Sequence, residues 1–177
     1  MNGNPQLTIA VKHAVRMDIT AHAMAQKRLR ESLWARDRIA KLHAAMDDIA
    51  AVEGQADCPL KHTFTPGLYA REIFVPAGTI VVTKIHKHEH PVFILRGDCT
   101  VYSNDGTLKR VTAPCMLVTP AGTKRAVYVH EDTVWVTVHA NPDNETDLEN
   151  LESLLIAKHY EDIPLLKETS KIEGGKP

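Results

Sequence analysis

The sequence predicts an all-β core, either an antiparallel barrel or a double-sheet jelly roll, with an α-helix on each side of it. Between about residues 60 and 140, short β-branched runs are separated by turn signals roughly every eight to twelve residues. Before and after this stretch, apolar residues recur at the spacing of an amphipathic helix. We therefore expect a helical extension at 1–57, a barrel at 58–142, and a helix with a frayed tail at 143–177.

The N-terminal helix is predicted by residues 21–53, which contain no Gly or Pro and are rich in good helix formers. Residues 1–20 show no clear period, and we expect a loosely ordered start there. Five apolar residues form a heptad seam on one helix face: Ala35, Ile39, Leu42, Met46 and Ile49. This seam can dock on the chain's own barrel or on a second copy, and it predicts a homo-oligomer, most simply a dimer.

The expected strands are short runs bounded by Gly, Pro, Asn or Asp. They span 62–65, 68–75, 79–86, 92–96, 99–103, 107–112, 115–119, 125–129 and 133–139. Asp105 and Gly106 give the strongest hairpin signal, because Gly accepts a positive φ without a Cβ penalty. Turns are also expected at 96–98 and 130–132. In the C-terminal helix, Thr146 and Glu149 fit a capping box.

Composition and charge argue against several classes of protein. The formal net charge of −1 over 177 residues offers no bulk attraction to nucleic acid or to a membrane surface, and we expect neither as a partner. The three cysteines are odd in number and lack metal or redox spacing, which is typical of reduced thiols. No signal peptide and no apolar run of about 18 residues is visible, so we expect a cytoplasmic protein.

Residues 86–90 are the most informative segment, because they place three histidines and a glutamate directly after an apolar run. Neutral imidazole is the commonest metal ligand and titrates near neutrality. Histidines at every second position indicate a metal site, a proton-transfer site or an anion pocket, depending on where each ring points. Strand alternation over 79–86 puts Lys84 and His86 on one face. On 133–139, His139 joins a site only if its own face is the interior one.

The segment 78–122 resembles the two sequence motifs of the cupin superfamily, also called RmlC-like proteins. Gly78 and Gly97 match the first and last glycines of the first motif, and His86 matches its second histidine. Pro120 and Gly122 match the proline and glycine of the second motif. The resemblance implies a double-stranded β-helix, a jelly-roll barrel whose first-motif residues point inward.

Other motif positions differ from the family pattern. Lys84 replaces the first histidine, His90 stands at the glutamate position, and Arg125 replaces the histidine of the second motif. The resemblance therefore implies that Lys84 and His86 both face the cavity. Residues 121–139 are similar to short cupin-like proteins encoded in bacteriophage genomes, which implies a host cytoplasm and no settled activity.

Three functions remain open at this point. In a metal-binding cupin enzyme, His86 and His90 with Glu89 or His88 would hold Fe, Mn, Ni or Zn, and His139 or His130 could be a further ligand. The family resemblance then implies dioxygenation, isomerisation or lyase chemistry on a small polar acid. The sequence identifies no catalytic residue beyond this ligand set.

The second hypothesis is a cupin without catalytic activity that binds a small anionic molecule. Lys84, His86 and Arg125 would form a cationic cluster, and a buried cation is costly unless an anion pairs with it. His139 is a further candidate for contact with such a ligand. The third hypothesis is a structural or assembly protein, phage-encoded, in which the histidine segment is a solvated turn.

Overall fold

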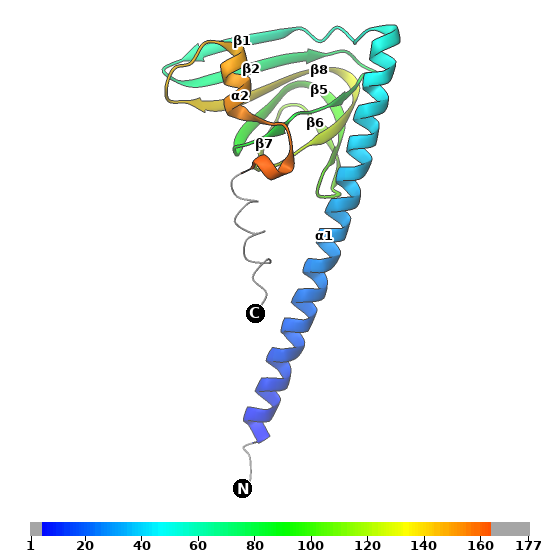
Figure 1. Cartoon of the computed structure of the whole chain (residues 1–177), viewed down its shortest axis with the longest axis vertical. Coiled ribbons are helices and arrows are strands. Elements are labelled where there is room, and N and C mark those ends of the chain that lie inside the picture. Colours follow the sequence, from blue (N-terminus) through cyan, green and yellow to red (C-terminus); the bar gives the residue numbers. More distant parts are fainter. Residues whose placement is uncertain (1–4, 164–177) are drawn as a thin grey trace.

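The computed structural model describes the backbone of residues 5–163 and, except at 5–15 and 19, their side chains. A long helix, α1, precedes a mostly antiparallel β-structure, and a short helix, α2, follows it (Figure 1). The elements are α1 (Pro5–Glu53), β1 (Leu60–Thr65), β2 (Gly67–Val75), β3 (Ile80–Val82), β4 (Ile85–His86), β5 (His90–Ser103), β6 (Leu108–Thr112), β7 (Cys115–Thr119), β8 (Arg125–Asn141), α2 (Leu148–Leu155), β9 (Ile156–Ala157) and the 3-10 turn η1 (Tyr160–Asp162).

One sheet contains most of the strands, in the order β1-β2-β8-β5-β6, with β3 paired to β8 and β7 paired to β5. All of these pairs are antiparallel. The sheet curls around an apolar core formed by Val75, Ile94, Cys99, Val101, Val111, Val127 and Val129. The predicted fold class, an all-β jelly-roll core with flanking helices, is confirmed.

Two predicted turns are wrong, because β5 and β8 each continue through them. The segment 96–98 lies inside β5, where the pairing with β8 shifts register at Arg96 and Asp98. Gly97 there has φ +96°, a backbone conformation that suits a bulge as well as a turn. The segment 130–132 lies inside β8 in the same way.

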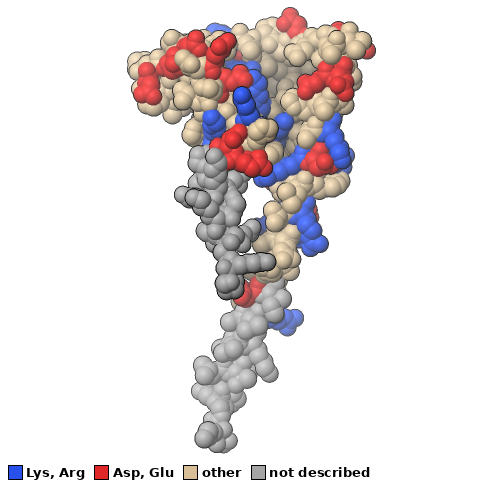
Figure 2. Space-filling view, in the orientation of Figure 1, with Lys and Arg blue, Asp and Glu red and all other residues tan. Residues whose placement is uncertain are grey.

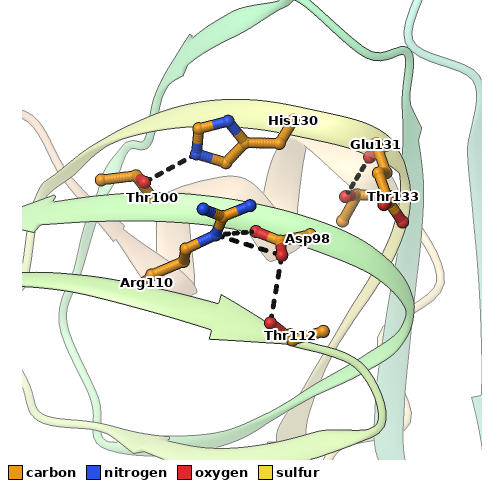
Figure 3. Close-up of polar contacts among 7 residues, drawn as sticks. All are labelled: Asp98, Thr100, Arg110, Thr112, His130, Glu131 and Thr133. Carbon is orange, nitrogen blue, oxygen red and sulfur yellow. Dashed lines mark hydrogen bonds and ion pairs between the residues drawn. The ribbon is translucent and has the colours of Figure 1, made fainter.

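Polar side chains cover the outer surface of this bulged region (Figure 3). Asp98 accepts hydrogen bonds from Arg110 Nε at 2.9 Å and from Thr112 Oγ1 at 3.1 Å, which join β5 to β6. The hydrogen bond from Arg110 holds the pKa of Asp98 below its usual value. On the neighbouring strand, His130 Nε2 lies 2.8 Å from Thr100 Oγ1. These contacts connect β5 to β6 and to β8 at the bulge, so these polar residues have a structural role.

The single strand predicted at 79–86 is interrupted. β3 ends at Val82 and β4 begins at Ile85. Between them, Thr83 N donates a hydrogen bond to Arg125 O at 2.8 Å, and Thr83 Oγ1 accepts one from Arg125 N at 2.9 Å. On β3, Val81 packs on the core and Ile80 is exposed, so the interior face is opposite to the predicted one. The break restores His86 to the interior but leaves Lys84 outside.

Helix α1 begins at Pro5, so the loosely ordered start predicted for 1–20 is wrong over 5–20. Proline is well accommodated in the first turn of a helix, and no later Gly or Pro interrupts the run. Ala35 and Ile39 are fully buried against the barrel, whereas Ile49 is exposed. Most of the heptad seam therefore packs within the same chain.

The N-terminal half of α1 extends away from the barrel (Figure 1). Every side chain described between 16 and 31 is exposed. Among residues 5–163, no helix combines the length and the apolar character that crossing a bilayer requires.

Helix α2 covers the end of the barrel that carries the histidines. Its buried residues Leu151 and Leu155 pack on Tyr69 of β2. Its N-cap is Asp147, whose side chain accepts a hydrogen bond from Asn150 N, so the predicted capping box at Thr146 is wrong. After α2, β9 pairs with β4 and fixes the position of His86. The frayed tail predicted at 168–177 lies outside the described residues.

Candidate metal centre

Three histidines from separate strands meet inside the barrel. His86 belongs to β4, His90 begins β5, and His139 lies near the end of β8. Each offers one ring nitrogen, and these three atoms all lie within 4.8 Å of one another. The ring centroids are 4.3 Å apart for His86 and His90, 4.4 Å for His90 and His139, and 5.2 Å for His86 and His139. We call this cluster the histidine triad.

Backbone pairing holds each member of the triad in place. His86 O accepts a hydrogen bond from Gly122 N at 2.8 Å, and β4 is held by β9 on its other side. His90 stands opposite Thr119 and His139 opposite Tyr69 in their ladders. His90 Nδ1 lies 3.1 Å from His88 O, which leaves Nε2 of that ring as the free nitrogen. The triad is therefore positioned by regular structure more than by loops.

Burial keeps all three imidazoles neutral at neutral pH. It lowers the pKa of His86 to about 3, with further lowering by the neighbouring His90 and His139. Burial also lowers the pKa of His139 to about 4 and lowers the pKa of His90. A neutral imidazole has a free lone pair, which is the form that binds a metal ion.

Two arginines, and no carboxylate among the described residues, shift the pKa values of the triad. The positive charges of Arg71 and Arg125 both lower the pKa of His86. Arg71 lies on β2 on the same face as Tyr69 and Val75, which are buried. Arg71 and Tyr69 were not predicted as site residues from the sequence, although the alternation of strand 68–75 places both on one face.

Three other predicted site residues lie elsewhere. Lys84 is exposed and its Nζ lies 2.6 Å from Glu152 Oε1 of α2, so the prediction that it faces the cavity is wrong. His88 and Glu89 are exposed on the turn between β4 and β5, and the cluster does not include them. The strand break at 83–84 explains the outward position of Lys84, because alternation does not carry across it.

The sequence left open whether the face of β8 that carries His139 points into the barrel, and the structure shows that it does. Thr133, Thr137 and His139 are all buried, so this face of β8 is the interior one. Tyr69 lies beside His139, with ring centroids 6.2 Å apart. The Tyr69 hydroxyl lies 2.7 Å from His62 Nδ1, which connects the triad to the edge of the sheet.

The donor set fits a divalent first-row metal. Nδ1 of His86 is buried and has no hydrogen-bond partner among the described residues, and an unpaired buried polar atom is costly. Three neutral nitrogens suit Zn, Fe, Ni or Mn and leave further coordination positions open. A bound metal would take up the lone pair of this nitrogen and so give it the partner that it lacks.

Comparison with known proteins shows likeness in fold. No protein-family model matches the chain, and no curated protein does. Similar solved structures include an RmlC-like cupin of Methanocaldococcus jannaschii with a double-stranded β-helix, at 14% identity and TM-score 0.42, covering 51% of this chain and 87% of that one. The Cnp3 cupin domain of Schizosaccharomyces pombe has 19% identity and TM-score 0.42, over 59% and 76% of the two chains. Ectoine synthase of P. lautus has 14% identity and TM-score 0.44, over 49% and 65%.

Proposed function

We propose that this chain is a cupin-like protein whose histidine triad holds a divalent transition metal and, with it, binds a small anionic molecule that it acts on or sequesters. The observation that carries this proposal is the convergence of three neutral imidazoles, those of buried His90 and His139 and of half-buried His86, whose Nδ1 is buried and unpaired. Structural histidines in a core normally satisfy their ring nitrogens with fixed partners. A shared metal ion would satisfy all three.

The charge balance favours an anionic ligand. A metal dication bound by neutral histidines keeps its full charge, and Arg71 and Arg125 add to it within the same low-dielectric interior. Neither arginine has an ion-pair partner among the described residues. A carboxylate or phosphate on the metal would balance these charges, and arginine can bind either group with two parallel hydrogen bonds.

Each group has a distinct role under this proposal. The metal, when bound, acts as a Lewis acid on the ligand oxygen it contacts. Arg71 orients the anionic group, and the apolar core together with α2 limits access of water. A phage origin stays a prediction from the resemblance of residues 121–139.

Cobalt titration tests the proposed function. We expect metal-free protein to bind one equivalent of Co²⁺ with visible absorption bands, and oxalate to shift those bands. Arg71→Gln removes a charge-assisted contact of roughly 1.5–3 kcal/mol, so the variant should need at least about tenfold more oxalate. Arg96→Gln is the control, because Arg96 is exposed and contacts Asp132 on the outer surface. Absence of saturable Co²⁺ binding, or an equal oxalate response in both variants, contradicts the proposal.

We also propose that the chain forms a homodimer. The contact would be made by the exposed N-terminal half of α1, and not by the heptad seam from which the dimer was predicted. This half carries the exposed apolar residues Met17, Met24 and Leu29, and most helical stability in proteins comes from packing of an apolar helix face. We expect sedimentation equilibrium at micromolar concentration to give twice the chain mass, and Met17→Glu with Met24→Glu to give the monomer. A monomeric unmodified protein contradicts the dimer.

A further inference from the structure

A second polar cavity lies where α1 meets the barrel, outside the histidine triad. Its volume is about 240 Å³, and its polar and charged lining comprises Ser32, Arg36, Ser103, Asn104, Asp105, Thr123 and Arg125. Figure 2 shows Lys and Arg side chains gathered on the lower part of the barrel and the adjoining stretch of α1. We call this the helix–barrel cavity. It has room for several water-sized groups, enough for a small oxyanion with part of an attached molecule.

Arg36 is the first residue that points to a ligand. Its Cζ lies 4.2 Å from the centroid of the Tyr160 ring, so the guanidinium is fixed by stacking. Its Nε is buried and has no hydrogen-bond acceptor among the described residues. A charged donor left unpaired in this way is costly. An acceptor in the cavity would remove that cost.

Arg125 contributes a second guanidinium from the barrel side. Its Nη1 donates to Thr119 Oγ1 at 2.8 Å, and no carboxylate of the described residues lies within ion-pair distance. Burial lowers its pKa, which reflects the cost of keeping the charge away from water. One neutral hydroxyl satisfies only one of the five guanidinium donors.

Four of the other lining side chains already have hydrogen-bond partners within the protein. Ser32 Oγ donates to Asn104 O at 3.0 Å, Asn104 Nδ2 donates to Gly122 O at 2.8 Å, and Thr123 Oγ1 donates to Pro120 O at 2.7 Å. Asp105, the single carboxylate in the lining, accepts from Thr107 N at 2.9 Å. The cavity thus has a fixed frame and a net positive lining, with spare donors on two arginines.

We infer that the helix–barrel cavity binds the phosphoryl group of a small molecule between Arg36 of α1 and Arg125 of β8. Two guanidinium groups from different elements, α1 and β8, can each pair with a different edge of a tetrahedral oxyanion, whereas a carboxylate presents a single edge. The site is independent of the metal and needs α1 docked on the barrel. Gly122, in its wall, bonds to His86, so the cavity adjoins the triad.

Calorimetric titration of metal-free protein with inorganic phosphate and pyrophosphate tests this inference. We expect one saturable site per chain for the unmodified protein and at least about tenfold weaker binding in Arg36→Gln. Arg36→Lys keeps the charge but loses the two-pronged geometry, and we expect an intermediate affinity. The matched control is Arg38→Gln, because Arg38 stacks on exposed Trp34 on the same helix and does not line the cavity.

The outcomes separate this site from the metal centre. Unchanged Co²⁺ binding and an unchanged melting temperature in Arg36→Gln, together with weaker phosphate binding, support the inference. Absence of saturable phosphate binding to the unmodified protein, or equal weakening in Arg38→Gln, overturns it. Tighter binding of acetate than of phosphate overturns the phosphoryl assignment. Loss of Co²⁺ binding in Arg36→Gln overturns the independence of the two sites.

Discussion

Replacement of His139 with alanine is expected to remove the bound metal. The triad would lose one of its three nitrogens, and two imidazoles alone hold a first-row metal far more weakly. Altering even the partners of metal ligands typically costs about 10–100-fold in affinity, so loss of a ligand should exceed about 100-fold. Elemental analysis after purification without chelator should give one metal per unmodified chain and less than about a tenth of that in His139→Ala.

His130→Ala is the matched control for this experiment. His130 lies on the same strand as His139, but it is exposed and contacts Thr100 on the outer surface (Figure 3). We expect this variant to keep its full metal content. His130→Ala losing the metal as completely as His139→Ala would show that the loss comes from damage to β8.

Two further variants distinguish the ligand set in the structure from the one the sequence suggested. His88→Ala and Glu89→Ala remove exposed side chains outside the triad, and both should retain the metal. A metal site lost in Glu89→Ala and kept in His139→Ala would reverse the assignment.

The sequence predicted part of the triad, and the missing part has a physical cause. His86 and His90 are close in sequence, and both were identified from the histidine-rich segment. His139 is about fifty residues further along the chain, and strand alternation left two faces open. Only the packing of β8, with Thr133 and Thr137 buried on the same side, decides between them. Arg71 lies on a strand away from the histidine-rich segment, and the alternation that puts it on the same face as Tyr69 does not show which face is the interior one.

Strand positions could be predicted better than strand continuity. The residue types that form turns also occur at bulges, so the glycine and charged residues of 96–98 indicated a turn where β5 continues. The reverse error occurred at 79–86, where β-branched residues on both sides of Lys84 predicted one continuous strand and concealed a break at Thr83. That break changes which residues face the barrel, and it explains why Lys84 contacts Glu152 of α2. Alternation is reliable only within a continuous strand.

Replacement of Gly97 with alanine is expected to destabilise the protein strongly. Gly97 has φ +96°, and a Cβ built on it would lie 2.6 Å from Asp132 O and 2.7 Å from Thr133 Cα, both backbone atoms of β8. Positive φ costs an L-residue roughly 1–2 kcal/mol, and overpacking costs about 1–3 kcal/mol more. We therefore expect a loss of about 3 kcal/mol in the free energy of unfolding, measured by urea denaturation. The corresponding fall in melting temperature should be about 10 °C.

Gly78→Ala separates the steric part of this effect from the backbone part. Gly78 also has positive φ, at +81°, but nothing lies within 4 Å of the position its Cβ would take. We expect this variant to lose only about 1–2 kcal/mol. Adding Thr133→Ala to Gly97→Ala should restore little stability, because the close backbone atoms of Asp132 and Thr133 remain. Equal losses in Gly97→Ala and Gly78→Ala would mean that β5 and β8 separate at the bulge without cost, and that the close packing there does not stabilise the barrel.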